Sequence, residues 1–275
     1  MPELPEVETL ARYLRRHLVG RRIRRVRVFT PSTIHSPAPR RFTQALRGRV
    51  ILAVERRGKY LLLRLDRDLV LVIHLRMTGD LEMVPRRRAL PPHVRVAFAL
   101  DGSDLWFEDQ RRFGHIDLLP ASALPLFDPL RRMGPEPLSR SFTPERFRAM
   151  LKPRRGALKP LLLRQEVLAG IGNLYADEIL FQARLHPGRR VEFLGPAEVR
   201  RLYLAIRQVL RRATSESARA GDPVGALLAV REVGGVCPRC GRPLTATRLG
   251  GRATYFCPAC QRRERPGAAA GRRDG

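Results

Sequence analysis

Four cysteines near the end of the chain constrain its fold more than any other feature of the sequence. They form two C-x2-C pairs separated by sixteen residues, namely Cys237, Cys240, Cys257 and Cys260. Two such pairs can place four thiolates tetrahedrally around one Zn²⁺ ion, at about 2.3 Å. The residues between them, LTATRLGGRATYFC, predict a hairpin with Gly250-Gly251 at its turn. Two disulfides or unpaired thiols are the alternative, which the absence of a secretory signal disfavours. Because four protein ligands leave no open coordination position, we expect this zinc to be structural.

The chain is strongly basic. Its 275 residues include 53 Lys plus Arg and 26 Asp plus Glu, which gives a formal net charge of +27. Such charge favours a polyanionic partner, and nucleic acid is the default. A GC-rich genome explains part of the Arg count, since only three lysines are present, but it does not explain the scarcity of acidic residues. With 44% hydrophobic residues, the chain can form buried cores and is not a disordered basic tail.

The sequence gives no sign of export or membrane insertion. It begins MPELPEVE, which lacks both the basic and the apolar region of a secretory signal. No uninterrupted apolar run approaches the ~18 residues of a membrane-spanning helix. We therefore expect a cytoplasmic protein that does not interact with a membrane.

Hydrophobic periodicity predicts an α+β fold with roughly two domains. A helical pattern over residues 7–18 ends at Gly20, and Thr143 with Pro144 predicts the start of a second helix. Closely spaced strand-like runs predict a β-sandwich or barrel; they cover 23–29, 50–65, 68–76, 94–100, 104–109 and 115–120. Further helices are expected over 157–168, 173–185 and 197–214, and a Pro-rich linker over 121–140. The predicted organisation is a β-sandwich domain (1–130), a helical domain (131–235), a zinc finger (236–261) and a disordered tail (262–275).

Pro2 is a candidate nucleophile. Removal of Met1 would expose a secondary amine, and an α-amino group is partly unprotonated near neutral pH. Such an amine can attack an electrophilic sugar carbon to form an iminium, while Glu3 and Glu6 could transfer protons. The alternative is an ordinary acidic first turn, which complements the helix dipole.

Lys59 and the GIGN motif (170–173) are two further candidates. In RRGKY, Lys59 can lose its proton when partly buried, whereas Arg effectively cannot; a solvated lysine is the alternative. The glycines of GIGN let backbone N–H groups approach a phosphate at a helix N-terminus, with the Asn173 amide as an additional donor. A plain connection between two helices explains the same motif.

The motifs HLRMTG (74–79) and DQRRFG (109–114) bring Arg, Met and Phe onto predicted loops. An enzyme that flips a base out of a duplex needs such side chains to fill the resulting gap. Alternatively, Met77 and Phe113 belong to the core.

Taken together, these motifs resemble the formamidopyrimidine-DNA glycosylase family, bacterial base-excision enzymes that remove oxidised purines. The resemblance runs from Met1 to about Gln261 and rests on MPELPEVET, RRGKYLLL, HLRMTG, RRFG, MGPEPLS, GIGNLYADE and RATYFCPAC. It implies an N-terminal β-sandwich with an N-terminal helix, a helical domain with a helix–two-turns–helix motif, and a zinc-finger hairpin. The implied partner is double-stranded DNA that contains oxidised bases or abasic sites, bound by a monomer in the bacterial nucleoid.

The resemblance also implies roles for individual residues. Pro2 corresponds to the Schiff-base nucleophile, Glu3 to the acid that assists sugar opening, and Glu6 to a supporting carboxylate. Lys59 corresponds to the proton donor of β-elimination, and Arg252 to the arginine that binds phosphate and serves in δ-elimination. The implied DNA-backbone contacts are His74, His93, Arg111, Arg112, Arg154 and Asn173. The implied gap-filling residues are Met77, Arg111 and Phe113.

Three departures from the family pattern bear on lesion recognition. Gln110 stands where the family has Pro, and Arg76 where it has Gly. The segment before Cys237 is about ten residues shorter than in relatives and contains no aromatic residue, although part of it covers the flipped base in the family. Two rival interpretations remain: an endonuclease VIII-type enzyme for oxidised pyrimidines, and a non-catalytic DNA-binding paralogue. The intact Pro2, Glu3 and Lys59 disfavour the paralogue.

Overall fold

The structure is a computed structural model that describes residues 2–86, 88–220 and 223–263. The chain divides into two compact units: the first ends at Met133 and the second begins at Gly134. The finer division into helical domain and zinc finger at residue 235 stays a prediction. The predicted disordered tail lies almost entirely outside the described residues.

Helix α1 (Leu4–Leu18) begins the first unit. Glu3 is its N-cap residue, and Pro5, whose missing N–H costs nothing in the first turn, is at its second position. The helix ends at Leu18, where Val19 is extended and Gly20 adopts a positive φ of 83°. Its apolar stripe is fully buried and consists of Leu4, Val7, Ala11, Leu14 and Leu18.

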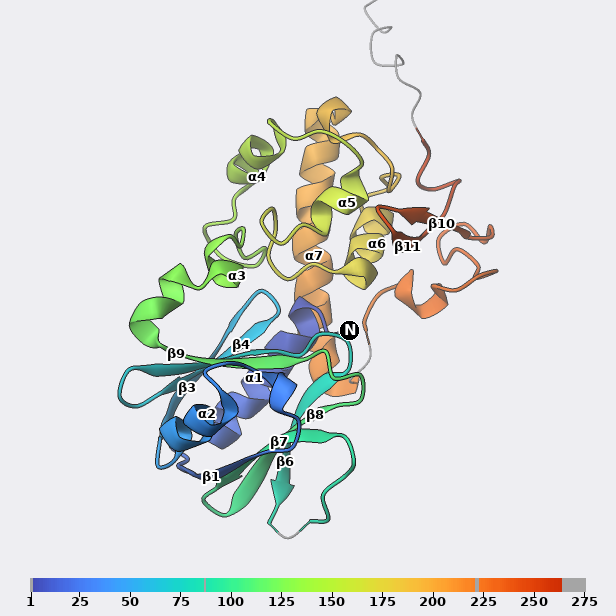
Figure 1. Cartoon of the computed structure of the whole chain (residues 1–275). Coiled ribbons are helices and arrows are strands. Elements are labelled where there is room, and N and C mark those ends of the chain that lie inside the picture. The colour runs from blue at the N-terminus through green and yellow to red at the C-terminus, as the bar shows by residue number, and fades with distance from the viewer. Residues whose placement is uncertain (1, 87, 221–222, 264–275) are drawn as a thin grey trace, which may run out of the picture. The chain divides into compact units, whose positions relative to one another are not determined.

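Two sheets form a β-sandwich in the first unit (Figure 1). The first has the order β1-β7-β8-β6, all antiparallel: β1 (Ile23–Val28), β7 (Val94–Leu100), β8 (Ser103–Asp109) and β6 (Gly79–Pro85). The second has the order β2-β9-β5-β4-β3: β2 (Ile34–Ser36), β9 (His115–Pro120), β5 (Leu69–His74), β4 (Tyr60–Leu65) and β3 (Ile51–Arg57). Only β2 and β9 pair in parallel among the strands of this sheet. Inward-facing side chains of both sheets pack with α1 and α2 (Pro39–Leu46) into one core.

The predicted linker at 121–140 is partly wrong. It contains the 3-10 helix η2 (Ala121–Leu126) and the helix α3 (Asp128–Arg131). Their apolar residues, with Leu124, Phe127 and Leu130 among them, pack on the outer face of β4 and β5 around Leu62, Val70 and Val72. The segment is folded because it has this apolar surface to cover. A shorter 3-10 turn, η1 (Pro31–Thr33), precedes β2.

Helices dominate the second unit. They are α4 (Pro144–Leu151), α5 (Leu158–Leu162), α6 (Asn173–Gln182) and α7 (Pro196–Ala220), with 3-10 turns η3 (Val191–Phe193) and η4 (Leu228–Val230). Thr143 caps α4 as predicted, since its hydroxyl accepts the Arg146 N–H at 3.2 Å. The zinc-finger hairpin pairs β10 (Thr245–Leu249) with β11 (Arg252–Phe256), and Gly250 and Gly251 form its turn with positive φ.

Three predicted helices have different bounds. The helix expected over 173–185 ends at Gln182. The helix expected over 157–168 covers only Leu158–Leu162. Beyond it, the Gln165 side chain donates to the carbonyls of Leu163 and Ile171 and accepts from the Gly170 N–H, which stabilises a turn instead of a helix. The helix expected over 197–214 continues to Ala220, supported by an Arg212–Glu216 ion pair at 2.8 Å across one turn.

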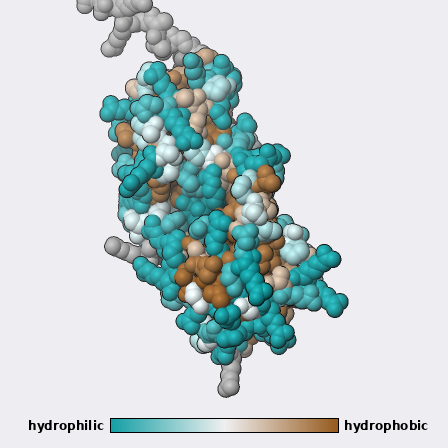
Figure 2. Space-filling view, turned by 90° about the vertical axis from the view of Figure 1, so that its left-hand side faces the viewer, coloured by the Kyte–Doolittle hydropathy of each residue, from teal (hydrophilic) through white to brown (hydrophobic). Residues whose placement is uncertain are grey.

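Hydrophilic side chains predominate on the face drawn in Figure 2, with hydrophobic ones in scattered patches between them. This agrees with a chain in which 29% of residues are charged. Among the described residues, no helix is both long and apolar enough to cross a membrane.

Candidate active site and metal centre

The start of α1 holds Pro2 in a defined position. Pro2 is half-buried, and the next residue, Glu3, is only 1% exposed. The Glu3 N–H donates to the Glu6 carboxylate at 2.8 Å, which is one half of a capping box and fixes the chain as it enters the helix. A buried carboxylate thus lies directly beside Pro2.

Lys59 lies at the turn of the β3–β4 hairpin, where Gly58 has a positive φ of 57° and Arg57 pairs with Tyr60. Its side chain is buried rather than solvated, with 8% exposed. The hairpin is joined to α1 because Arg56 Nε donates to Glu8 at 2.8 Å. The alternative of a solvated lysine is therefore excluded for Lys59.

His74 is the last residue of β5, and the pairing of β4 with β5 places it opposite Tyr60. Burial, together with the nearby Arg76, His115 and Lys59, lowers the pKa of His74 to about 3. The ring is therefore neutral. Its Nδ1 accepts the Arg76 N–H at 2.9 Å, so the remaining proton resides on Nε2, which can donate to a phosphate oxygen.

Asp109 organises the two loops that carry the predicted gap-filling residues. Its Oδ1 accepts from the Thr78 hydroxyl and from the Arg111 N–H at 3.2 Å, and its Oδ2 accepts from the Gly114 N–H at 2.7 Å. A Cβ on Gly114 would lie 2.6 Å from the Phe107 ring, so a larger residue does not fit there. The carboxylate thereby joins HLRMTG to RRFG. This role was not predicted, although an acidic residue directly before a basic loop is a usable signal.

Met77 and Phe113 do not belong to the core: 38% and 53% of their surface is exposed. The Arg111 guanidinium lies 4.8 Å from the Phe113 ring centroid, in cation–π geometry. Arg112 is exposed beside them with a left-handed φ of 58°, and His93 is exposed just before β7. The first unit thus presents exposed apolar side chains, Met77 and Phe113, together with the cationic Arg111.

In the second unit, the predicted DNA contacts lie at helix ends. Arg154 follows α4 and is half-buried, and its guanidinium donates to the Met150 carbonyl. Asn173 is the first residue of α6, and within the described residues its buried Oδ1 has no hydrogen-bond partner. The Gly170 N–H is already used by Gln165, at 2.9 Å. The phosphate-binding capacity of GIGN therefore depends on its C-terminal part.

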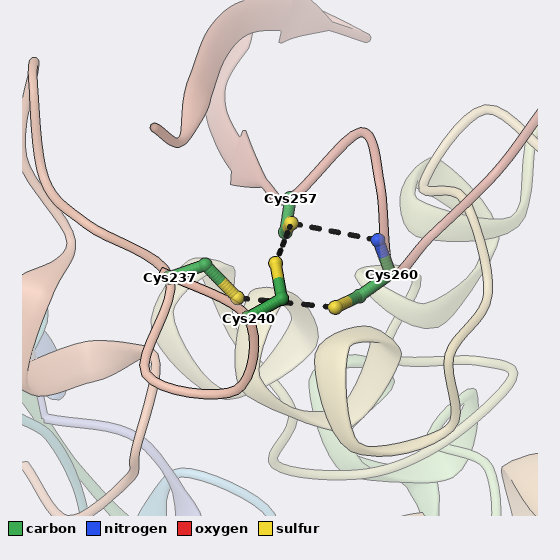
Figure 3. A group of neighbouring side chains, drawn as sticks. All are labelled: Cys237, Cys240, Cys257 and Cys260. Carbon is green, nitrogen blue, oxygen red and sulfur yellow. Dashed lines mark hydrogen bonds between the residues drawn. The ribbon is translucent and has the colours of Figure 1, made fainter. Parts of the chain in front are cut away.

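The four cysteine side chains point toward one another (Figure 3). Their Sγ atoms all lie within 4.8 Å, with Cys237–Cys260 at 3.9 Å and Cys240–Cys257 at 3.5 Å. A tetrahedral site with Zn–S bonds of about 2.3 Å requires S–S separations of about 3.8 Å. The donor set and its spacing therefore fit zinc and exclude the disulfide alternative, because the distances are far longer than a covalent S–S bond.

A buried ion network holds the hairpin that carries the exposed Arg252. Lys159 Nζ, which is fully buried, lies 2.7 Å from an Asp177 oxygen and donates to the Ala253 carbonyl at 2.8 Å. Arg231 pairs with the other Asp177 oxygen at 2.8 Å. The Tyr255 N–H also donates to Asp177, which joins α6 to β11, and the two lie side by side in Figure 1. Sequence reasoning missed this network, although Lys159 is one of only three lysines.

Glu178 fixes the short segment before the zinc finger. Its carboxylate accepts from the N–H groups of Ala226 (3.2 Å), Leu227 (2.8 Å) and Leu228 (3.2 Å). A Cβ on Gly225 would lie 2.5 Å from the same carboxylate. The segment is therefore tied to α6. An acidic pair, Asp177-Glu178, inside an otherwise apolar helix is the signal that could have revealed both anchors.

Comparison with known proteins covers nearly the whole chain. Family models match the formamidopyrimidine-DNA glycosylase N-terminal domain (residues 1–116), the formamidopyrimidine-DNA glycosylase H2TH domain (133–221) and the zinc finger found in FPG and IleRS (234–263). The formamidopyrimidine-DNA glycosylase of Symbiobacterium thermophilum is 44% identical, over 97% of this chain and 94% of the relative. That of Thermus thermophilus is 42% identical, over 95% and 98%. The structure of Lactococcus lactis Fpg with DNA containing an abasic site superposes with a TM-score of 0.88 at 29% identity, covering 95% of this chain and all of that one.

The fold, the N-terminal site and the cysteine cluster define a zinc-finger DNA glycosylase of base-excision repair. The chain belongs to the formamidopyrimidine-DNA glycosylase family. This confirms the predicted α+β fold class, the family resemblance, the enzymatic function and one structural zinc ion per chain. The roles of individual site residues stay predictions.

Proposed function

We propose that the chain excises oxidised purines, both formamidopyrimidines and 8-oxoguanine, from duplex DNA and then cleaves the strand at the abasic site. It acts as a monomer on the nucleoid DNA of a bacterial cytoplasm. The observation that carries the proposal is the placement of Pro2 at the N-terminus of α1 beside the buried Glu3. The related Lactococcus lactis protein has been seen with DNA containing an abasic site and with DNA containing N7-benzyl-Fapy-dG.

In the first step the unprotonated Pro2 nitrogen attacks C1′ of the damaged nucleotide. The bond from C1′ to the base nitrogen breaks, and the base leaves with that electron pair and takes up a proton, while the Pro2 nitrogen gives up the proton that it carried. The C1′–O4′ bond then opens, the Pro2 nitrogen forms an iminium with C1′, and Glu3 supplies the proton to O4′. A carboxyl held out of bulk water suits this transfer, and Glu6 supports it by fixing the backbone of Glu3.

Strand cleavage follows from the iminium, which acidifies C2′–H. Loss of that proton expels the 3′-phosphate, and Lys59 provides a proton and a phosphate contact at this stage. Loss of the C4′ proton then expels the 5′-phosphate, with Arg252 on the zinc hairpin binding it. Water finally hydrolyses the iminium and regenerates Pro2. The burial of Lys59 at the turn of the β3–β4 hairpin supports this role, because it confines the side chain.

DNA is held by contacts that carry no sequence information. We assign the phosphate contacts to His74, His93, Arg111, Arg112, Arg154 and Asn173. Met77, Arg111 and Phe113 fill the gap in the stack when the damaged nucleotide is flipped out. The exposure of Met77 and Phe113, and the cation–π contact of Arg111, support this assignment.

Borohydride trapping tests the nucleophile, because reduction of the iminium joins enzyme and DNA covalently. A chain that retains Met1, and the variant Pro2→Gly, should each lose most of the trapped complex on abasic-site DNA. In both, the secondary amine is absent or blocked, although the rest of the site is intact. The yield is read as the shifted band on a denaturing gel.

Pro31→Gly is the matched control, since Pro31 is an exposed proline in η1 that the proposed chemistry does not use, and it should trap like the parent chain. Undiminished trapping by both Pro2 variants would assign the nucleophile elsewhere, with Lys59 as the next candidate.

A further inference from the structure

A stack of three histidine rings crosses the second sheet of the first unit. His35 in β2 lies parallel to His115 in β9, with ring centroids 4.2 Å apart and planes 6° apart. His115 in turn lies parallel to His74 in β5, at 5.5 Å and 8°. Three of the six histidines of the chain are thus gathered on neighbouring strands. Of these three histidines, only His74 has a role in the proposed glycosylase function.

Asp117 adds a carboxylate to this group. It lies two residues after His115 on β9, so the two side chains project from the same face of the strand. One ring nitrogen of His35, one of His115 and one oxygen of Asp117 all lie within 4.8 Å of one another. His115 and Asp117 are 5% exposed, whereas His35 is exposed at the surface. The cluster therefore has a buried floor and an open side.

The polar atoms of this cluster are poorly satisfied. His115 Nδ1 is buried, and within the described part of the chain it makes no hydrogen bond. Asp117 forms no salt bridge with any described residue, although burial of an unpaired charge is costly. A buried imidazole nitrogen without a hydrogen bond and a buried carboxylate without an ion pair are groups that a bound metal ion would satisfy together.

We propose that His35, His115 and Asp117 bind a divalent transition-metal ion, with at least one further coordination position left to water. Two imidazoles and one carboxylate suit Zn²⁺, Co²⁺, Ni²⁺ or Cu²⁺, whereas Mg²⁺ and Ca²⁺ prefer a shell of oxygen atoms. This site is distinct from the cysteine cluster, which lies in the other unit and has a closed set of four sulfur ligands.

Ligand binding at this site requires one movement. The lone pairs of imidazole nitrogens lie in the ring plane, so two parallel rings cannot both direct them at one ion. The exposed His35 ring can rotate, whereas His115 is confined between His35 and His74. Metal binding should therefore separate the His35 and His115 rings and hold His115 firmly against His74.

Metal counting on the full chain tests the site. The protein with its zinc finger already loaded is dialysed against micromolar Zn²⁺, and bound zinc is measured by mass spectrometry. We expect two zinc ions per chain for the parent protein and one for His35→Ala and for Asp117→Asn. His17→Ala is the matched control, because His17 is an exposed histidine on α1, and it should retain two.

Cobalt distinguishes this site from the finger. Added Co²⁺ should produce weak d–d absorption without a sulfur-to-cobalt charge-transfer band, and His35→Ala should abolish that signal. Because His35 is exposed, this variant keeps its fold, which circular dichroism verifies. A single zinc ion in the parent chain, or two in His35→Ala, would overturn the proposal. Loss of the second ion in His17→Ala would equally overturn it, since it would indicate adventitious binding to surface histidines.

Discussion

A single carboxylate, that of Asp109, sets the conformation of the loop that carries Arg111, Arg112 and Phe113. It accepts hydrogen bonds from Thr78, Arg111 and Gly114 at the point where two loops meet. A hydrogen bond to a charged acceptor contributes about 1.5–3 kcal/mol, and losing the acceptor leaves buried donors unsatisfied. The proposed gap-filling residues therefore depend on a residue that does not itself contact DNA.

Asp109→Asn should disturb this arrangement without removing any proposed DNA contact. The new amide group directs N–H toward a backbone N–H that previously donated to the carboxylate. We expect the free energy of unfolding to fall by about 1–3 kcal/mol. Affinity for abasic-site duplex should fall about tenfold, which corresponds to about 1.4 kcal/mol. Urea unfolding and a fluorescence-anisotropy titration measure the two effects.

Asp104→Asn provides the comparison, because Asp104 lies half-buried on the same strand and away from the loop. This variant should leave both the free energy of unfolding and the affinity for abasic-site duplex nearly unchanged. If Asp109→Asn binds abasic-site DNA like the parent chain, the loop is held by other contacts and its proposed dependence on this carboxylate is wrong.

Sequence reasoning identified residues with distinctive chemistry and missed those that act through burial. Pro2, Lys59 and the cysteines stand out by type and spacing, and the structure gives each the surroundings that its proposed chemistry needs. Asp109, Asp177 and Glu178 are ordinary acidic residues in the sequence. Their importance comes from the donors that the fold brings to them from segments up to 78 residues away, as in the bond from Tyr255 in β11 to Asp177. A local pattern can mark such residues as candidates, but it does not give the partners that the fold brings to them.

At the scale of elements, strands with a strong apolar pattern were predicted almost to the residue, and weakly patterned ones were not. The strand expected over 94–100 is β7, which is buried at nearly every position. In contrast, β6 was not predicted, because GDLEMVP begins with Gly-Asp and is only intermittently buried. Helix α2 was also missed, since only Phe42 and Leu46 of its eight residues are buried. For β6 and α2, tertiary packing rather than local propensity determined the secondary structure.

Loss of one zinc ligand should affect the second unit alone. Cys257→Ser removes a buried thiolate at the base of β11, so the chain should release its zinc and DNA affinity should fall by roughly ten- to a hundredfold. The β-sandwich has its own core and should remain folded. Trp106 is the chain's only tryptophan and lies buried in β8, so its fluorescence reports the first unit specifically.

Thr247→Ser is the matched control, a conservative change at an exposed position of the same hairpin. It should keep its zinc, its affinity and its fluorescence. A Cys257→Ser chain that retains both metal and activity would refute the structural role of the cluster. Unfolding of Trp106 in that variant would refute the independence of the sandwich.

The segment before the zinc finger predicts a difference between lesions. 8-Oxoguanine differs from guanine only at O8 and N7–H, so discriminating them needs donors and acceptors close to the flipped base. In this chain the segment lacks aromatic residues, and the N–H groups of Ala226, Leu227 and Leu228 are bound to Glu178. Few groups of the segment are thus available to read the base.

We therefore expect three different single-turnover rates. Abasic-site cleavage should be fast, because Pro2, Glu3 and Lys59 do not depend on the segment. Ring-opened formamidopyrimidines should be excised well, since their altered shape can be recognised without it. 8-Oxoguanine should be excised about tenfold more slowly than the formamidopyrimidines, a barrier difference of about 1.4 kcal/mol. Abasic-site cleavage serves as the internal control. Equal rates for the two base lesions would show that Arg76 or residues 224–233 supply the missing contacts.

At the scale of the whole molecule, the net charge of +27 should govern binding to undamaged duplex. Each phosphate that is neutralised releases condensed counterions, so the logarithm of the affinity falls linearly with the logarithm of the salt concentration. The proposed site contains five cationic side chains for phosphate: Lys59, Arg111, Arg112, Arg154 and Arg252. Five contacts predict a slope of about −4.5.

The salt dependence of binding distinguishes the proposed DNA-binding site from the basic end of the chain. Residues 262–275 contain five Arg and two acidic residues, which gives a net charge of 5 − 2 = +3. If binding uses the proposed site, deleting 262–275 should change the salt slope by less than about 1, whereas Arg112→Gln and Arg154→Gln should each reduce it by about 1. Arg140→Gln, at an exposed arginine outside the proposed contacts, is the matched control and should leave the slope unchanged. Affinities measured by anisotropy across a salt series give all of these slopes. A slope that flattens by about 3 on deletion would mean that the tail, and not the proposed site, supplies most of the contacts to undamaged DNA.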